Sequence, residues 1–324
     1  MKNLKNKHLT LQNFRTITTS SVRSSSLLSL HPWCVTGFSD GESCFSTTIK
    51  KKNNKLKAGW EVLVTFCIAL HKKDLVLLES IKSFLGVGNI TNGGKDMIQF
   101  RVRVLKDLTA VINHFDKYPL ITQKFADYQL FKQVVDLKNC KEHLTSEGLQ
   151  KIENLKASMN WGLSSELKAA FPDTIPVQRP LVSSEKFNSD WLAGFVAAES
   201  SFFINIRKSL SCSLGESVTL RFQIVQHTRD ALLMESIRNF FGCGGCYKNN
   251  SAGSVTTFCV ESLSDLTEKI IPFFDKYSVE GVKALDFSDF KRASDIIKSQ
   301  GHKTKEGLEQ IRKIKVGMNR GRSS

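Results

Sequence analysis

Residues 33–45 read WCVTGFSDGESCF, and residues 191–203 read WLAGFVAAESSFF. In each stretch an apolar run built on small residues predicts a short helix, which ends in one carboxylate, Glu42 or Glu199, and runs directly into a strand. A chain that makes this unit twice can pair the two helices, and pairing would bring the two glutamates together. The plainer alternative is two ordinary buried helices, each with a glutamate at its exposed end.

The spacing of the small residues favours pairing. Gly37 and Gly41 lie four positions apart on one helical face, and Gly194 and Ala198 take the same places in the second stretch. Glycine inside a helix costs about 1 kcal/mol relative to alanine, so its use needs a reason. Small residues at this spacing permit the close approach of two helix backbones. We therefore expect the two helices to be in contact.

The repetition extends well beyond these helices. Residues 66–74 (FCIALHKKD) recur as residues 222–230 (FQIVQHTRD), and residues 116–118 (DKY) recur as residues 275–277. Two copies of about 130 residues indicate a duplicated domain rather than a solenoid. The expected fold class is α+β, with two pseudo-symmetric αββαββα repeats, the paired helices at their interface and antiparallel sheets that form a saddle.

Hydrophobic periods predict the elements of the first copy. Strands are predicted over residues 44–52, 60–70, 87–91 and 97–105, with turns at Asn53-Asn54 and Asn92–Gly94. Helices are predicted over residues 74–84, 108–114, 121–137 and 147–158, and Gly86 is a suitable stop for the first of them.

The domain boundaries follow from the repeat and from composition. Residues 31–162 and 188–321 are predicted to form the two domains, joined by a linker of residues 163–187 that contains three prolines. Residues 1–30 carry five Lys or Arg, no Asp or Glu, and many Ser and Thr. That composition is typical of a mitochondrial targeting segment, although a basic disordered arm has the same composition.

The charge of the chain is strongly positive. It has 46 Lys and Arg against 31 Asp and Glu, a net charge of +15 and an isoelectric point near 9.4. Such an excess attracts phosphate and favours nucleic acid as the partner, although solubility or a basic organelle would also explain it. No apolar run approaches the roughly 18 residues needed to cross a bilayer, so no membrane association is expected.

The eight cysteines indicate a reducing compartment, because several lie in apolar or strand-like runs where a reduced thiol acts as a small hydrophobe. Cys243 and Cys246 form a CxxC, which raises the possibility of zinc or redox chemistry. A structural zinc site needs a second ligand pair, and none stands out in the sequence. A glycine turn before a strand is the favoured interpretation.

Polar and apolar side chains alternate along the predicted strands. One face of each sheet would pack on helices and the other would carry Arg, Lys, Gln, Asn and Thr, types that read base edges in the major groove. Any half-exposed antiparallel sheet alternates in this way, but its repetition in both copies favours a DNA-facing surface. The predicted DNA-binding residues are Ser46, Thr48, Lys50, Lys52, Thr65, Gln99, Arg101 and Arg103 in the first copy and Phe203, Asn205, Arg207, Thr219, Arg221 and Gln223 in the second.

Both helix segments resemble the LAGLIDADG motif, and the flanking sequence is similar to that of single-chain LAGLIDADG homing endonucleases. The I-OnuI-like branch, encoded in fungal mitochondrial introns, is the most similar. Residues 118–124 (YPLITQK) and 141–145 (KEHLT) strengthen the resemblance, which covers about residues 31–321. It implies a mitochondrial protein that acts on double-stranded DNA as a monomer with internal pseudo-two-fold symmetry.

The resemblance also implies roles for individual residues. The implied catalytic residues are Glu42, Glu199, Gln226, Lys124 and Lys283, and the implied metal ligands are the two glutamates with the carbonyl groups of Gly41 and Ala198. Leu70 stands at the place of Gln226 in the first copy and cannot act on water. The chain departs from the motif at Ser43 and Ser200, where glycine usually follows the acid, and at Ala197, where the first copy has Asp40. We expect these departures to affect efficiency more than chemistry.

Two neighbouring carboxylates repel each other unless a cation lies between them. Mg²⁺ prefers oxygen ligands and keeps water, and Ca²⁺ or Mn²⁺ are expected to substitute. The resemblance implies cleavage of both strands of a long, non-palindromic target across the minor groove, leaving 3′ overhangs. Two other functions share the scaffold: an intron RNA maturase with weak or no nuclease activity, and a DNA-binding regulator. Retention of both glutamates favours cleavage.

Overall fold

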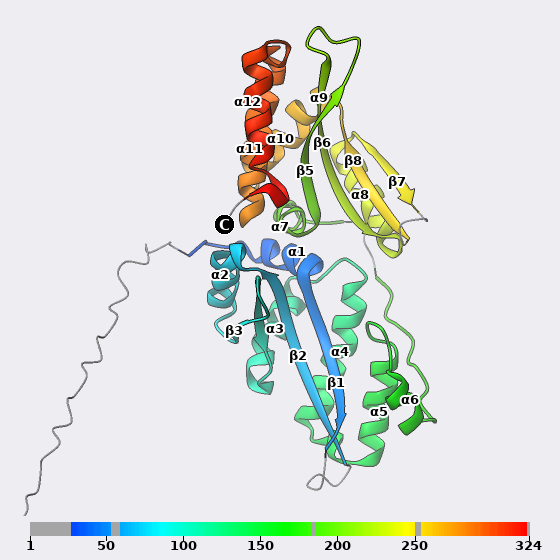
Figure 1. The fold of residues 1–324 in the computed structure, drawn as a ribbon. Helices are drawn as coiled ribbons and strands as arrows, with labels where there is room; N and C mark the ends of the chain where they lie inside the picture. The colour runs from blue at the N-terminus through cyan, green and yellow to red at the C-terminus, as the bar shows by residue number, and fades with distance from the viewer. Residues whose placement is uncertain (1–26, 53–58, 183–185, 250–253, 323–324) are drawn as a thin grey trace, which may run out of the picture.

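The structure is a computed structural model that describes residues 27–52, 59–182, 186–249 and 254–322. Two units of similar build stack on one another, and helices α1 (Pro32–Glu42) and α7 (Ser189–Glu199) lie side by side at their junction (Figure 1). The predicted α+β class with two αββαββα repeats is confirmed. Residues 1–26 and the predicted turn at Asn53-Asn54 lie outside the described residues.

The two central helices touch through their backbones. A Cβ added to Gly37 would lie 1.9 Å from the carbonyl oxygen of Trp191, and one added to Gly194 would lie 2.1 Å from that of Cys34. A Cβ on Gly41 would lie 2.4 Å from the Cβ of Ala198. Only hydrogen fits at these three places, so the expected close pairing of the helices is confirmed.

Each unit contains one antiparallel four-stranded sheet. The strand orders are β1-β2-β4-β3 in the first unit and β5-β6-β8-β7 in the second, so the two sheets have the same topology. The strands are β1 (Ser43–Lys51), β2 (Trp60–His71), β3 (Asn89–Asn92), β4 (Met97–Val102), β5 (Ser200–Lys208), β6 (Glu216–His227), β7 (Gly245–Asn249) and β8 (Val255–Val260). Buried and half-exposed residues alternate along β1 and β2, as predicted for sheets with one covered face.

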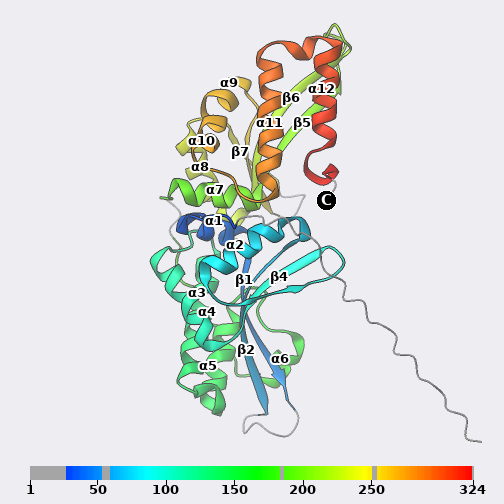
Figure 2. The ribbon, with the colours of Figure 1, turned by 90° about the vertical axis from the view of Figure 1, so that its left-hand side faces the viewer.

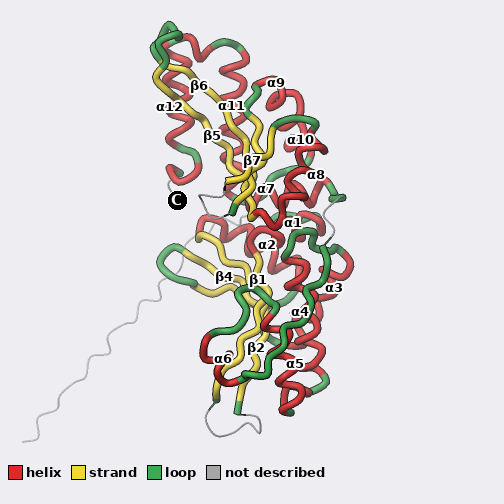
Figure 3. Tube along the Cα trace, turned by 90° about the vertical axis from the view of Figure 1, so that its right-hand side faces the viewer, coloured by secondary structure: helices red, strands yellow, loops and turns green. Residues whose placement is uncertain are grey.

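Helices cover the buried face of each sheet. In the first unit, α3, α4 and α5 form one layer and the strands form the other (Figure 2). The helices of the first unit and its linker are α2 (Leu75–Leu85), α3 (Leu105–Lys117), α4 (Lys124–Asn139), α5 (Ser146–Ala157) and α6 (Ser165–Ala170). Those of the second unit are α8 (Ala231–Phe241), α9 (Leu263–Asp265), α10 (Ile271–Lys276), α11 (Val282–Lys298) and α12 (Lys305–Val316). Figure 3 shows α1 and α7 at the centre of this arrangement.

Aromatic rings fill the space between sheet and helices. Phe45 of β1 contacts Phe66, Phe115, Tyr128 and Phe131, with ring centroids between 5.1 and 5.4 Å apart. All five side chains are almost fully buried. The second unit repeats the cluster around Phe202. These cores hold β1 and β5, the strands that follow the two glutamates, in fixed positions.

Three predicted elements begin or end at other residues than expected. The strand predicted over 97–105 ends at Val102, and α3 begins at Leu105 rather than at residue 108. Arg103 therefore lies beyond the strand, in an exposed position. Helix α4 begins at Lys124 rather than at Ile121, and the Asp40 carboxylate accepts hydrogen bonds from the backbone N–H groups of Ile121 and Thr122, just before the helix.

The segment proposed as the linker contains a helix that the sequence did not predict. Ser164 caps α6 by accepting a hydrogen bond from the backbone N–H of Leu167, whose side chain is buried. Phe171, just after α6, packs on Trp60 with ring centroids 5.1 Å apart. This contact holds the segment beside the edge of β2 (Figures 2 and 3). Among the described helices, none is both long and apolar enough to span a bilayer.

Candidate active site

The two glutamates meet where α1 and α7 end. Glu42 and Glu199 are the last residues of the two helices, and both side chains are half-buried. The Oε1 atom of Glu199 lies 3.2 Å from the position that a Cβ on Gly41 would take, so it lies beside the residue that precedes Glu42. Burial, followed by the charge of Glu199, raises the pKa of Glu42 to about 7. Burial also raises the pKa of Glu199.

The serines after the acids stabilise the turn from helix to strand. The Ser43 hydroxyl donates to the carbonyl oxygen of Ser39 at 2.7 Å, and the Ser200 hydroxyl donates to that of Val196 at 2.6 Å. Each hydroxyl thus adds a second hydrogen bond to a carbonyl that already accepts one from the backbone N–H of the same serine. The departure from the family's glycine is therefore accommodated locally and in the same way in both units.

Two half-buried lysines reach the ends of the same helices. The Lys124 ammonium donates to the carbonyl oxygens of Gly41 at 2.8 Å and Ser39 at 3.0 Å, and the Lys283 ammonium donates to that of Ser200 at 2.8 Å. Burial lowers the pKa of both lysines, and neighbouring carboxylates oppose the shift. The structure thus brings both sequence-predicted lysines to the glutamates. The two contacts differ, because Lys283 bonds Ser200 rather than Ala198, the equivalent of Gly41.

The surroundings of the two acids differ in one further way. The Gln226 side chain hydrogen-bonds Glu199, which lowers the pKa of that carboxyl and opposes the effect of burial. Leu70 takes the equivalent place in the first unit, where it is 7% exposed and lines the cleft beside Glu42. The two acids therefore have different neighbours.

Asp40 has a structural partner that explains why its equivalent, Ala197, is not acidic. The buried Asp40 carboxylate accepts a hydrogen bond from the Trp191 indole Nε1–H at 2.7 Å and from the Thr122 hydroxyl at 2.6 Å. The residue equivalent to Trp191 in the first helix is Cys34, which brings no indole donor to Ala197. The acid and its donor are thus both replaced in the second half, so position 197 holds no buried carboxylate in need of a partner.

A cleft of about 1060 Å³ lies between the two units beside Glu42. Its wall includes Leu70 and Asp74 from the first unit and Phe203, Glu280 and Lys283 from the second. Both units are needed to form it, and it joins Glu42 to Phe203 of β5. A substrate that enters the cleft therefore reaches the Glu42 carboxylate and Lys283 together.

The strand register places the predicted DNA-binding residues on one face of each sheet. Ser46 lies opposite Thr65, and Asn205 lies opposite Thr219, and directly opposed residues of an antiparallel pair project to the same side. Of the predicted set, Ser46, Thr48, Lys50, Thr65, Gln99 and Arg101 lie on β1, β2 and β4, and Phe203, Asn205, Arg207, Thr219, Arg221 and Gln223 lie on β5 and β6. Lys52 and Arg103 lie just beyond their strands, and Lys52 forms an ion pair with Glu61 at 2.9 Å.

Two arginines on these faces are held by neighbours. A guanidinium nitrogen of Arg101 donates to the Gln99 side-chain oxygen. The Nε of Arg221 contacts the sulfur of Cys259 at 3.0 Å and the carboxylate of Glu261 at 3.1 Å. These contacts limit the orientations of both guanidinium groups, so the hydrogen-bond donors of Arg101 and Arg221 are partly ordered on the sheet faces.

Sequence reasoning missed polar residues on the short strands β3 and β7. Asn89 and Thr91 pair with Arg101 and Gln99, so they share the polar face of the first sheet. In the second sheet, Tyr247 is 62% exposed and lies opposite Thr257. Strands of four and five residues contain too few alternations to reveal a face, and only the pairing with β4 and β8 does so.

The donors at the junction suit a hard cation. Within the described ranges, no group of three or more His, Cys, Asp or Glu side chains is arranged to hold a metal ion. Burial raises the pKa of both carboxyl groups, and the charge of Glu199 raises that of Glu42 further. A cation between the two groups would stabilise their ionised forms. An ion such as Mg²⁺, which keeps several waters and takes one or two protein carboxylates, fits this donor set.

The CxxC is a turn, as predicted. Gly244 has a φ of +77°, and β7 begins at Gly245. The Cys246 thiol donates to the carbonyl oxygen of Met234 at 3.4 Å, and burial raises the pKa of that thiol to about 11. All eight cysteines are free thiols.

Known proteins share both the sequence and the fold. The chain is 39% identical over 290 residues to the probable intron-encoded endonuclease 3 of Neurospora crassa, and 40% identical over 302 residues to the probable intron-encoded endonuclease 2 of the same fungus. Each match covers 88% of this chain, which spans 54% and 64% of the length of these curated relatives.

Solved structures extend this likeness to three dimensions. The I-SmaMI LAGLIDADG homing endonuclease bound to cleaved DNA superposes with a TM-score of 0.89 at 44% identity, covering 91% of this chain and 98% of that protein. Another structure of I-SmaMI holds an uncleaved DNA target in the presence of calcium ions. The sequence pattern of the LAGLIDADG endonucleases matches residues 35–135 and again residues 192–294. This chain, with its two matched copies and paired helices, belongs to the LAGLIDADG endonuclease family.

Proposed function

We propose that the protein is a site-specific double-strand DNA endonuclease that hydrolyses phosphodiesters with a divalent metal ion and leaves 3′ overhangs. The strongest support for this proposal is the arrangement of charged side chains at the junction of the two units. Glu42 and Glu199, from separate units, meet at the ends of two backbone-packed helices, with Lys124 and Lys283 beside them and a polar sheet face on either side.

The carboxylates of Glu42 and Glu199 would hold the metal ion, for which we propose Mg²⁺, with Ca²⁺ or Mn²⁺ able to substitute. The ion supplies activation of water and stabilisation of the charge that develops on the leaving 3′ oxygen. The ammonium groups of Lys124 and Lys283 stabilise the negative charge on the scissile phosphates. The Gln226 amide orients the Glu199 carboxylate through their hydrogen bond. The carbonyl of Gly41, which already accepts from Lys124, and that of Ala198 are proposed as auxiliary ligands.

The polar faces of the two sheets are proposed to bind the target. Their residues differ between the units, as with Thr48 and Asn205 on the first strands, so one chain can recognise a non-palindromic sequence as a monomer. Arg101 and Arg221 suit guanine, and Gln223 suits adenine. The net charge of +15 supplies attraction to phosphate that does not depend on sequence.

Selection of cleaved sites from a randomised duplex library tests the proposal. The purified protein with Mg²⁺ is expected to enrich one long target and to cut both of its strands. Glu42→Gln and Glu199→Gln are each expected to abolish cutting while DNA affinity is kept. The matched control is Asp275→Ala, which removes only an exposed ion pair with Lys291. Tight binding of one DNA sequence by the wild-type protein, without cutting under Mg²⁺ or Mn²⁺, would overturn the proposal.

An intron RNA maturase is the second candidate, because the net charge of +15 attracts the phosphates of RNA as well as those of DNA. It predicts binding of intron RNA and faster splicing that do not require Glu42 or Glu199. We also propose a mitochondrial location, which the acid-free, basic composition of residues 1–30 supports. Import of a fusion carrying these residues into isolated mitochondria tests the location.

A further inference from the structure

A second repeated motif lies close to the glutamates and has no assigned role. Residues 71–74 (HKKD) and 227–230 (HTRD) follow the long strands β2 and β6. In each copy the histidine Nδ1 accepts a hydrogen bond from a backbone N–H two residues later, from Lys73 at 3.2 Å and from Arg229 at 3.1 Å. This bond caps one turn of 3₁₀-helix, over Lys72–Asp74 and Thr228–Asp230, and an aspartate ends each turn.

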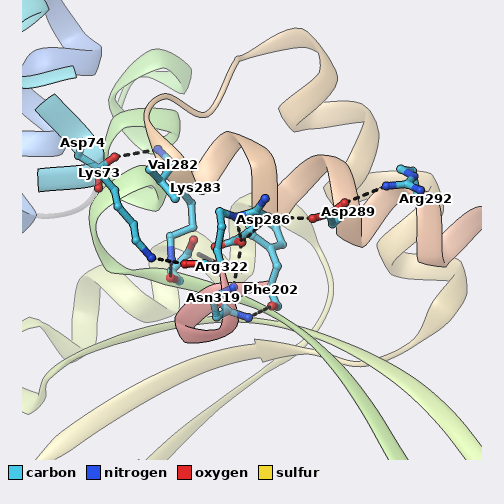
Figure 4. A network of polar contacts seen from close by, with 11 residues as sticks. Lys73, Asp74, Phe202, Val282, Lys283, Asp286, Asp289, Arg292, Asn319 and Arg322 are labelled. Carbon is cyan, nitrogen blue, oxygen red and sulfur yellow. Dashed lines mark hydrogen bonds and ion pairs between the residues drawn. The ribbon is translucent and has the colours of Figure 1, made fainter. Parts of the chain in front are cut away.

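Both aspartates reach across the junction to the other unit. The Asp74 Oδ1 accepts a hydrogen bond from the backbone N–H of Val282 at 2.7 Å (Figure 4), and the Asp230 Oδ1 accepts one from the backbone N–H of Gln123 at 2.8 Å. Val282 is the first residue of α11, and Gln123 immediately precedes α4. Carboxylates suit these positions, because backbone N–H groups are left free at a helix N-terminus and the helix dipole favours negative charge there.

The bonded N–H group belongs in each case to the residue before a site lysine. Val282 precedes Lys283, and Gln123 precedes Lys124. The path of α11 near Asp74 is further restricted by Gly281, which has a φ of +72° and where a Cβ would lie 2.7 Å from the Asp74 Oδ1. Each aspartate therefore fixes the backbone from which a lysine extends toward the glutamates.

Each lysine reaches the central helix of its own unit. The Lys124 ammonium donates to the carbonyl oxygens of Ser39 and Gly41 at the end of α1, and the Lys283 ammonium donates to that of Ser200, directly after α7. The lysine and the helix end that it contacts therefore come from one unit, and the aspartate that fixes the lysine's backbone comes from the other.

We propose that Asp74 and Asp230 are positioning residues, each of which fixes the backbone that carries the site lysine of the opposite unit. It follows, given the endonuclease function proposed above, that each DNA strand is cut at a centre built from both units. Loss of one aspartate then misplaces one lysine and slows one strand, whereas a role in general stability would slow both strands equally.

Cutting of a selected target, with each strand labelled separately, tests this in the full-length protein with Mg²⁺. Asp74→Ala is expected to slow the strand that Lys283→Met slows, and Asp230→Ala the strand that Lys124→Met slows. The slowing expected for a misplaced group is about tenfold or more on that strand, with the other strand changed by less than about threefold. Asp74→Asn keeps an oxygen acceptor and is expected to restore most of the lost rate. Asp275→Ala again serves as the control and leaves both rates unchanged.

Hydrogen exchange of the same variants, followed by mass spectrometry without DNA, gives a readout that does not need cutting. Asp74→Ala is expected to lower protection at the start of α11 and to leave the start of α4 unchanged, and Asp230→Ala to do the reverse. Equal slowing of both strands by either alanine variant, or unchanged protection at both helix starts, would overturn the positioning role. Absence of cutting by the wild-type protein, together with the expected exchange changes, would instead count against the endonuclease function alone.

Discussion

Replacement of Gly194 by alanine tests how closely the two central helices must approach. The new Cβ would lie 2.1 Å from the carbonyl oxygen of Cys34, whereas real Cβ contacts essentially never fall below 3.0 Å. The obstacle is backbone, so no change of rotamer relieves it. The helices must move apart by about 0.9 Å, the difference between 3.0 and 2.1 Å, at this crossing.

Two effects of opposite sign set the expected magnitude. Overpacking of a well-filled contact typically costs about 1–3 kcal/mol or more, and alanine regains up to about 1 kcal/mol of helix propensity. We therefore expect the free energy of unfolding to fall by about 2 kcal/mol. A displacement of about 1 Å at a reacting centre can cost about a hundredfold in rate, so cutting should suffer more than stability does.

Urea unfolding and the rate of cutting of a selected duplex measure the two effects. Gly317→Ala is the matched control, because its Cβ would lie 3.5 Å from the nearest atom, an ordinary contact, at the end of α12. This control should change stability by less than about 0.5 kcal/mol. If Gly194→Ala matched the control in both stability and rate, the close approach of the helices would not be what aligns the glutamates.

Three further predictions concern stability and specificity. Both carboxylate oxygens of Glu153 are buried without a hydrogen-bond partner in the described structure, and burial raises the pKa of this group to about 7. The contribution of the Glu153 carboxyl to stability is thus present below its unfolded pKa, near 4.5, and is lost as the pH rises through 7. At pH 8, Glu153→Gln should therefore be more stable than the wild type by about 2–3 kcal/mol in urea titrations. An equal pH dependence of the two proteins would contradict this. Trp191→Phe removes the indole donor to the buried Asp40. A double-mutant cycle with Asp40→Ala should give a coupling energy of about 1–2 kcal/mol in thermal unfolding. Additive effects of the two substitutions would contradict a stabilising hydrogen bond between these side chains. Arg221→Ala should reduce discrimination at one base pair by about 1–3 kcal/mol in a cleavage-selectivity profile, and an unchanged profile would remove Arg221 from base recognition.

The fold was largely predictable because its signals are local. Helix and strand periods, glycines four positions apart and the repeat itself are properties of neighbouring residues, so the two units and the pairing of α1 with α7 follow from them. The exceptions have two causes. The segment before α4 contacts Asp40, which lies 81 positions before Ile121, and such a distant contact leaves no signal in the local pattern. The helix in residues 163–187 was missed because six residues form too short a pattern.

The candidate site, like the fold, was predicted from the sequence only in part. The sequence by itself determined that two glutamates end two matching helices, that lysines stand at equivalent positions, and that polar side chains alternate along the sheets. Only the tertiary structure decided which helix end each lysine contacts, that Asp74 and Asp230 reach the opposite unit, and that the Trp191 indole donates to Asp40. These contacts join residues up to 208 positions apart, as Asp74 and Val282 are, and their energies depend on distance and burial in the folded chain. Neither quantity is encoded in the spacing of residues along the sequence.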